Sequence, residues 1–131
     1  MAASMGSEQL RDVEEQISGL LSQMTLEEKL GQMSQTAFPG FNDQVKDEVR
    51  KGRWGSFYNG GTIQEKLELQ RIALKESRLG IPLIFGQDVI HGYHTTWPIP
   101  LGQASTWDPE LVQMAARMTA REACAEGVHW T

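Results

Sequence analysis

The segment at residues 80–93, with the sequence GIPLIFGQDVIHGY, constrains the fold of this chain more than any other. It is a short apolar run, rich in branched and aromatic side chains, that opens with Gly-Ile-Pro and closes with glycine. This pattern predicts a strand over residues 81–87 that is buried on both faces. In parallel sheets, ligands bind at the carboxyl ends of strands, where the connecting loops converge. Asp88, which follows the predicted strand, is therefore the first candidate for a ligand-binding residue.

Helical patterns alternate with short strand-like segments along the chain. Apolar spacing and capping signals predict helices at residues 8–24, 25–33, 42–51, 62–78 and 108–126. Shorter segments are expected to be extended, at residues 35–40, 54–58 and 128–131. The connections are long enough to hold helices, which implies parallel pairing and an α/β fold. Since two or three parallel strands leave both sheet edges unpaired, we expect an incomplete domain that can self-associate through those edges.

Composition and charge argue against several classes of function. The chain has 131 residues, of which 40% are apolar and 22% charged, as in ordinary globular proteins. Its net charge of −5 and the absence of a basic stripe give no reason to expect a nucleic-acid partner. No apolar run approaches the roughly 18 residues that span a bilayer, so a membrane partner is not expected. Residues 1–6 lack the apolar core of a signal peptide and are expected to be a frayed or non-native end, so the compartment stays unknown.

Two further features give local expectations. Cys124 is the single cysteine, which excludes an intramolecular disulfide, and its place on the predicted last helix favours a small buried side chain. Pro98 and Pro100 argue against a helix through residues 94–102, which are expected to form an ordered loop.

The residues themselves leave several roles open for Asp88. It can act as a general base, a metal ligand, a turn-stabilising residue or an acceptor for ligand hydroxyls. Asp88, His91 and His94 recur at every third position, a spacing that suits a metal site on one helical face. However, Gly92 and the following Thr-Thr-Trp-Pro favour a loop, so no metal is expected. His91 is instead expected to hold its own loop through hydrogen bonds.

The tryptophans have two readings. Aromatic faces can stack on a sugar ring, but packing against the core is the commoner role of a tryptophan side chain. The four candidates are Trp54, Trp97, Trp107 and Trp130.

Four stretches together resemble the N-terminal part of family 3 glycoside hydrolases, the β-glucosidase and β-xylosidase group. They are MTLEEKLGQM at 24–33, RWGSF at 53–57, the segment at 80–93, and PIPLGQASTWD at 98–108. They occur in the family's order, and the match runs from about residue 24 to residue 131. Four co-linear stretches are far more specific than any single motif.

The resemblance implies a (β/α)8 barrel of the TIM type followed by a second α/β domain, with residues 7–131 as the N-terminal part of the barrel domain. Asp88 matches the family's substrate-binding aspartate, which accepts hydrogen bonds from hydroxyls of the non-reducing terminal sugar. His91 and Gly92 would support its loop. The resemblance implies a β-glucoside or oligosaccharide substrate, no cofactor, and the rest of the barrel and the second domain as partners.

The family reaction is retaining hydrolysis, in which two carboxyl groups about 5–5.5 Å apart act as nucleophile and acid/base. The resemblance places both carboxyl groups, and the lysine, histidine and arginine that grip the sugar, beyond Thr131. Asp88 would lie at the non-reacting end of the sugar, so no catalytic residue is expected here and the chain alone is expected to be inactive. The alternative is a non-catalytic fragment or half-barrel that binds sugar or pairs with a complementary chain.

Overall fold

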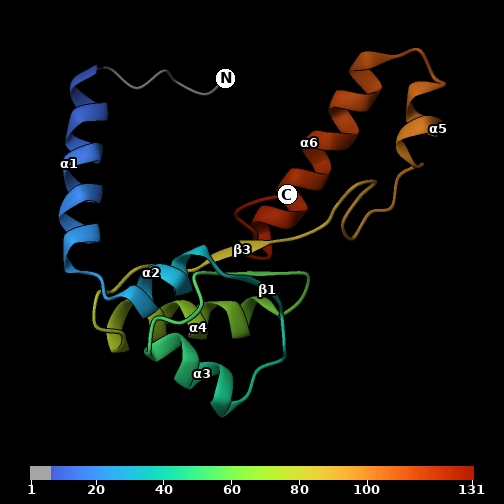
Figure 1. Cartoon of the computed structure of the whole chain (residues 1–131). Helices are drawn as coiled ribbons and strands as arrows, with labels where there is room; N and C mark the ends of the chain where they lie inside the picture. The colour runs from blue at the N-terminus through green and yellow to red at the C-terminus, as the bar shows by residue number, and fades with distance from the viewer. Residues whose placement is uncertain (1–6) are drawn as a thin grey trace.

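The computed structural model describes residues 7–131, so the expectation for residues 1–6 lies outside the described part. In that part, helices and short strands alternate along the chain (Figure 1). The elements are α1 (Ser7–Gln23), α2 (Leu26–Met33), β1 (Gln35–Ala37), α3 (Asp43–Arg50), β2 (Ser56–Tyr58), α4 (Ile63–Glu76), β3 (Ile84–Gly86), α5 (Pro100–Ala104) and α6 (Pro109–Ala125).

The predicted helix starts are confirmed at three caps. At α2, the Thr25 hydroxyl accepts from the Glu28 amide at 3.2 Å, and the Glu28 carboxylate accepts from the Thr25 amide at 2.9 Å. Thr62 and Glu65 form the same reciprocal pair at α4, at 3.3 and 2.7 Å. Asp108 accepts from two backbone amides in the first turn of α6. These bonds pair amides that the helix itself leaves free, which fixes where each helix begins.

The three strands form one sheet in the order β1-β2-β3. Both pairs are parallel, which is the pairing that the alternating pattern predicts. In the central strand, Ser56 lies opposite Gln35 of β1 and Ile84 of β3. Beyond β3, the Gln87 amide donates to the carbonyl oxygen of Trp130 at 3.0 Å, and a parallel bridge forms at Gly86. The expected extended segment at residues 128–131 therefore runs beside β3.

The core lies between the sheet and helices α3 and α4, which cover one face of the sheet (Figure 1). The Phe57 ring is central: it stacks on Phe85 with ring centroids 6.0 Å apart and meets Phe38 and Trp54 edge-on at 5.8 and 5.3 Å. Trp54 therefore packs against the core. The buried residues of this cluster are Val45, Val49, Phe57, Leu69, Ile72, Ala73, Leu83 and Phe85.

The opposite face of the sheet is open, so the prediction of a β3 strand buried on both faces is wrong. Leu83 and Phe85 are 3% and 2% exposed, whereas Ile84 between them is 48% exposed. Successive strand residues point to opposite faces, and none of the described elements covers the face that carries Ile84. Tyr58, on the neighbouring strand, is also exposed.

The expectation of a helix-free loop through residues 94–102 is wrong at its end. Helix α5 begins at Pro100, which occupies the first turn. Proline is tolerated there because the first amides of a helix have no intrahelical partner and its fixed φ suits the helix.

Cys124 is exposed on α6, so the expectation of a buried thiol is also wrong. The buried side of α6 is formed by Ala115, Thr119 and Ala123, one residue every four positions. Cys124 follows Ala123 and so lies about 100° around the helix from that line.

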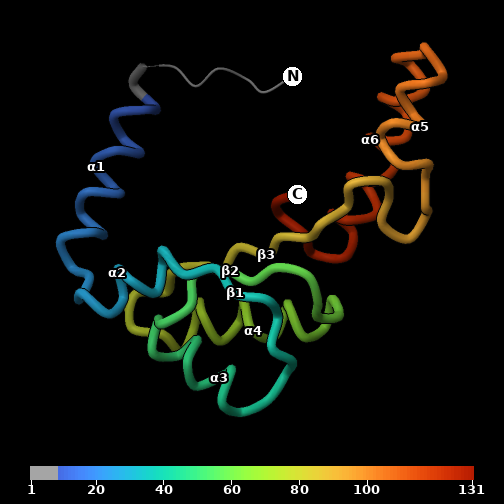
Figure 2. The backbone as a smooth tube through the Cα atoms, turned by 45° about the vertical axis from the view of Figure 1, so that its right-hand side comes forward, coloured from blue at the N-terminus to red at the C-terminus, as the bar shows by residue number. Residues whose placement is uncertain are grey.

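Helix α1 projects away from the sheet and its covering helices in both views (Figures 1 and 2). Its apolar residues Leu10, Val13, Ile17 and Leu21 are between 38% and 49% exposed. Near its carboxyl end, Arg78 donates to the carbonyl oxygen of Gln23 at 2.8 Å. Within residues 7–131, no helix is long and apolar enough to cross a membrane.

Candidate functional site

The segments that follow the three strands are joined to one another at the carboxyl edge of the sheet. The Phe38 amide donates to the carbonyl oxygen of Tyr58 at 2.9 Å, and the Asn59 amide donates to that of Gly86 at 3.1 Å. The Asp88 amide donates to the Asn59 side-chain oxygen at 2.8 Å. Asp88 thus lies at the end of β3, where the sequence predicts it, and its backbone is fixed to the end of β2.

The Asp88 carboxylate is exposed and only half engaged. Its Oδ1 accepts from the Ile90 amide at 3.3 Å, which stabilises the turn after β3. Its Oδ2 has no protein donor among the described residues. The turn-stabilising role and the role of ligand acceptor are therefore compatible, because each uses a different oxygen.

The loop after Asp88 is tied together by His91 and Trp97. The Trp97 amide donates to the His91 carbonyl oxygen at 2.7 Å, and His91 Nδ1 lies 3.2 Å from the Trp97 carbonyl oxygen. Since that oxygen can only accept, Nδ1 carries the proton. Gly92, at φ 122°, lies so close to Thr95 that an added Cβ would meet the Thr95 carbonyl oxygen at 2.0 Å. Only glycine fits this bend.

Glu122 anchors the far arm of the loop to α6. Its carboxylate accepts from the amides of His94 and Thr95 at 3.0 and 2.9 Å and from the Thr95 hydroxyl at 2.5 Å. These bonds, chiefly those from Thr95, hold the pKa of Glu122 below its usual range. Sequence reasoning missed this anchor because its partners lie 27 and 28 positions away along the chain.

The structure does not bring Asp88, His91 and His94 together as metal ligands. His94 Nε2 lies 3.7 Å from the Glu126 carboxylate, and its ring contacts Tyr93 with centroids 4.5 Å apart. Across the described residues, no group of three or more histidine, cysteine, aspartate or glutamate side chains is placed to hold a metal ion.

Asp88 borders three hollows at this edge of the sheet. One of about 390 Å³ also involves Asn59 and Trp130, and one of about 300 Å³ involves Asn59 and His91. The third, of about 350 Å³, extends past Trp97 to α6. Among the described residues that line them, Asp88 is the one acidic side chain. The hollows thus offer one acidic side chain beside other hydrogen-bonding groups and aromatic rings.

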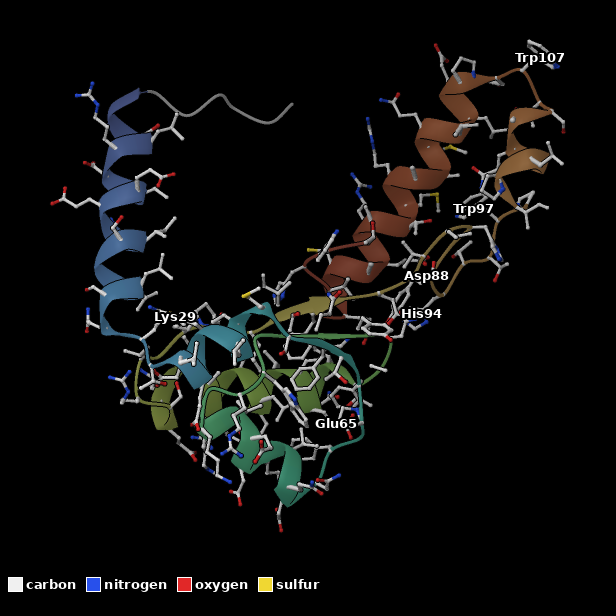
Figure 3. The ribbon with its side chains drawn as sticks, in the orientation of Figure 1. Lys29, Glu65, Asp88, His94, Trp97 and Trp107 are labelled. Carbon is white, nitrogen blue, oxygen red and sulfur yellow. The ribbon has the colours of Figure 1, made fainter. Side chains whose placement is uncertain are left out.

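The structure separates the four tryptophans. Trp54 packs on the core, and Trp107 is 93% exposed at the far end of α6, away from Asp88 (Figure 3). Trp97 and Trp130 line hollows that Asp88 also borders. The Trp97 indole nitrogen is buried and has no hydrogen-bond partner in the described part of the chain. Only Trp97 and Trp130 therefore stay as candidates for contact with a ligand at Asp88.

Lys66 is a second feature that the sequence did not indicate. Its side chain is buried, and its ammonium group donates to the Glu126 carbonyl oxygen at the end of α6 at 2.9 Å. Burial lowers the pKa of Lys66. The bond fixes α6 to α4 and thereby sets where residues 127–131 reach β3.

Comparison with known proteins agrees with this geometry. The family model described as Glycosyl hydrolase family 3 N terminal domain matches residues 25–131. A periplasmic beta-glucosidase of Salmonella typhimurium is 34% identical over 117 residues, which cover 88% of this chain and 15% of that protein. A beta-xylosidase of Formosa agariphila is 30% identical over 117 residues, covering 89% of this chain and 12% of that protein.

A crystal structure of a beta-glucosidase from Listeria innocua in complex with glucose superimposes with a TM-score of 0.74 at 37% identity. The match covers 88% of this chain and 18% of that one, so this chain spans less than a fifth of the length of these relatives. The parallel sheet and its helices are the N-terminal portion of a (β/α)8 barrel of the TIM type. On these grounds, the chain belongs to glycoside hydrolase family 3.

Proposed function

We propose that this chain is part of a retaining β-glucosidase-like glycoside hydrolase that acts on non-reducing terminal β-D-glucosyl residues, and that Asp88 binds hydroxyl groups of that sugar. The observation that carries the proposal is the half-engaged carboxylate of Asp88, which borders three hollows at the carboxyl edge of a parallel sheet. A carboxylate acceptor contributes roughly 1.5–3 kcal/mol per hydrogen bond to a hydroxyl. His91 and Gly92 support the loop that carries it.

In this proposal Asp88 binds and does not react. Retaining hydrolysis requires two carboxyl groups about 5–5.5 Å apart, one on each side of the bond that is cleaved. Asp88 is the one acidic side chain among the described residues that line the hollows. The 131-residue chain is therefore expected to bind a glucoside without hydrolysing it.

The proposal extends the barrel domain over residues 7–131, so that α1 is included. Two contacts support this: the bond from Arg78 to Gln23, and the buried side chain of Met24, which is 9% exposed. Both join the carboxyl end of α1 to the body of the domain.

The experiment is a titration of the chain with methyl β-D-glucoside, followed by NMR amide shifts. Shifts are expected at Asp88, His91 and Gly92, and Asp88→Asn is expected to weaken the Kd roughly 10- to 100-fold. Asp108→Asn is the matched control. Asp108 caps the start of α6, asparagine caps a helix equally well, and glucoside binding should not change. Unchanged binding by Asp88→Asn contradicts the proposal. So does hydrolysis of an aryl β-glucoside by the chain that Asp88→Ala abolishes, since Asp88 would then react.

A second candidate function is pairing with a complementary chain, as a non-catalytic half-barrel. The open sheet face with Ile84 and Tyr58, and the exposed apolar side of α1, favour it. Analytical ultracentrifugation of the chain, alone and mixed with the remaining segment of the barrel, tests this function: a stable complex supports pairing, and separate monomers over a wide concentration range disfavour it.

A further inference from the structure

Asn59 and Asp88 share one arrangement: each side chain binds a backbone amide through one polar atom and has a second polar atom with no partner among the described residues. Asn59 Oδ1 accepts from the Asp88 amide at 2.8 Å, and Asp88 Oδ1 accepts from the Ile90 amide at 3.3 Å. Because an amide N–H can only donate, the Asn59 oxygen must face Asp88, so its Nδ2 is the free end. No hydrogen bond of that nitrogen is present within residues 7–131.

The backbone alone does not require asparagine at this position. Asn59 has φ 51°, in the left-handed region that asparagine tolerates and that glycine adopts more easily. Its amide donates to Gly86 at 3.1 Å, and Phe38 packs against Gly60 so closely that an added Cβ would lie 2.9 Å from it. The turn is thus fixed by backbone bonds and packing. The side chain of Asn59 adds only the link to Asp88 and a spare donor.

We infer that Asn59 is the positioning residue of the sugar site and that it forms a donor–acceptor pair with Asp88. Both side chains line the hollows of about 390 and 300 Å³. A carboxylate oxygen accepts from one hydroxyl, and an amide nitrogen donates to another, so the pair suits two neighbouring hydroxyls of a pyranose. The inference rests on the proposed function, since it names a partner of Asp88 within the same site.

Two variants separate the positioning role from the donor role. Asn59→Gly keeps the turn conformation and removes both polar atoms, whereas Asn59→Asp keeps the acceptor for the Asp88 amide and removes the donor. Asn42→Gly is the matched control, because Asn42 Oδ1 accepts from the Val45 amide at 3.0 Å at the start of α3. Each variant of the whole chain is measured for hydrogen exchange of the Asp88 amide and for the Kd of methyl β-D-glucoside.

Asn59→Gly is expected to speed exchange of the Asp88 amide at least about tenfold and to weaken glucoside binding about tenfold. Asn59→Asp is expected to keep the amide protected yet weaken binding roughly 2- to 10-fold, because a donor is lost and a second carboxylate is placed beside that of Asp88. Asn42→Gly changes neither quantity. If Asn59 had only a structural role, a variant that protects the Asp88 amide would also bind the glucoside normally. Slow amide exchange together with weakened binding in Asn59→Asp therefore supports the donor role.

The failures can be told apart. If the wild-type chain binds the glucoside and Asp88→Asn loses it, but both Asn59 variants bind as tightly as wild type, the inference is overturned and the proposed function stands. If Asp88→Asn binds the glucoside as tightly as the wild-type chain does, both the proposed function and the inference are contradicted. Should Asn59→Gly fail to fold, Asn59→Asp decides, and an unchanged Kd in that variant overturns the inference.

Discussion

The ammonium group of Lys66 lies 2.9 Å from the carbonyl oxygen of Glu126, inside the protein and at the carboxyl end of α6. Lys66 is only 3% exposed. A cation at this end of a helix pairs with carbonyls that have no intrahelical partner. The bond joins α4 to α6, and so it holds residues 127–131 beside β3 and keeps the third hollow next to Asp88.

We predict that Lys66→Met lowers the free energy of unfolding by about 1–3 kcal/mol, since it leaves a carbonyl oxygen of the α6 end without a partner. Urea unfolding measures this directly. Lys75→Met is the control, because Lys75 is exposed on the same helix, and a change within about 0.5 kcal/mol is expected there. Equal effects of the two substitutions would show that the buried bond contributes nothing.

A second prediction concerns Glu28, which caps α2 and pairs with Arg78. The Arg78 guanidinium and the Thr25 amide lower the pKa of Glu28 to about 2, from an ordinary value of 4.5. Because the pKa is lower in the folded chain, the stabilisation is fully present above about pH 4.5 and is lost as the pH falls toward 2. The stability difference between wild type and Glu28→Gln should therefore shrink over this range, and a difference independent of pH would contradict the assignment.

A third prediction concerns the bend at Gly92. Gly92→Ala would place a Cβ 2.0 Å from the Thr95 carbonyl oxygen at a positive φ, so the loop must open. We expect a loss of about 1–3 kcal/mol in the free energy of unfolding, together with weaker glucoside binding. Gly19→Ala is the control: nothing lies within 4 Å of its Cβ position in α1, and alanine favours a helix. Equal free energies of unfolding for Gly92→Ala and Gly19→Ala would mean that the bend does not require glycine at position 92.

Helix starts and strand ends that depend on residues close in sequence could be predicted. Hydrogen bonds between residues far apart in the sequence could not. The caps at Thr25, Thr62 and Asp108 involve partners two or three positions away, so the helix starts follow from local pattern. Asp88 could be placed at a strand end because β3 has a clear apolar run. The bond of Lys66 to Glu126 spans 60 positions and that of Asn59 to Asp88 spans 29, and no local pattern records either.

The errors share the same origin. Ile84 belongs to an apolar run that looks buried throughout, but burial depends on which elements cover each face of the sheet. For Cys124, burial depends on which side of α6 faces its neighbours.

The most direct test of the central claim is a hybrid enzyme in which this chain replaces the matching segment of the Listeria innocua beta-glucosidase. The superposition with that protein, at a TM-score of 0.74, makes the exchange feasible. If Asp88 binds the sugar, the hybrid hydrolyses an aryl β-glucoside, and Asp88→Asn lowers kcat/KM by roughly 10- to 100-fold or more. An active hybrid whose kcat/KM is unchanged by Asp88→Asn would contradict the claim.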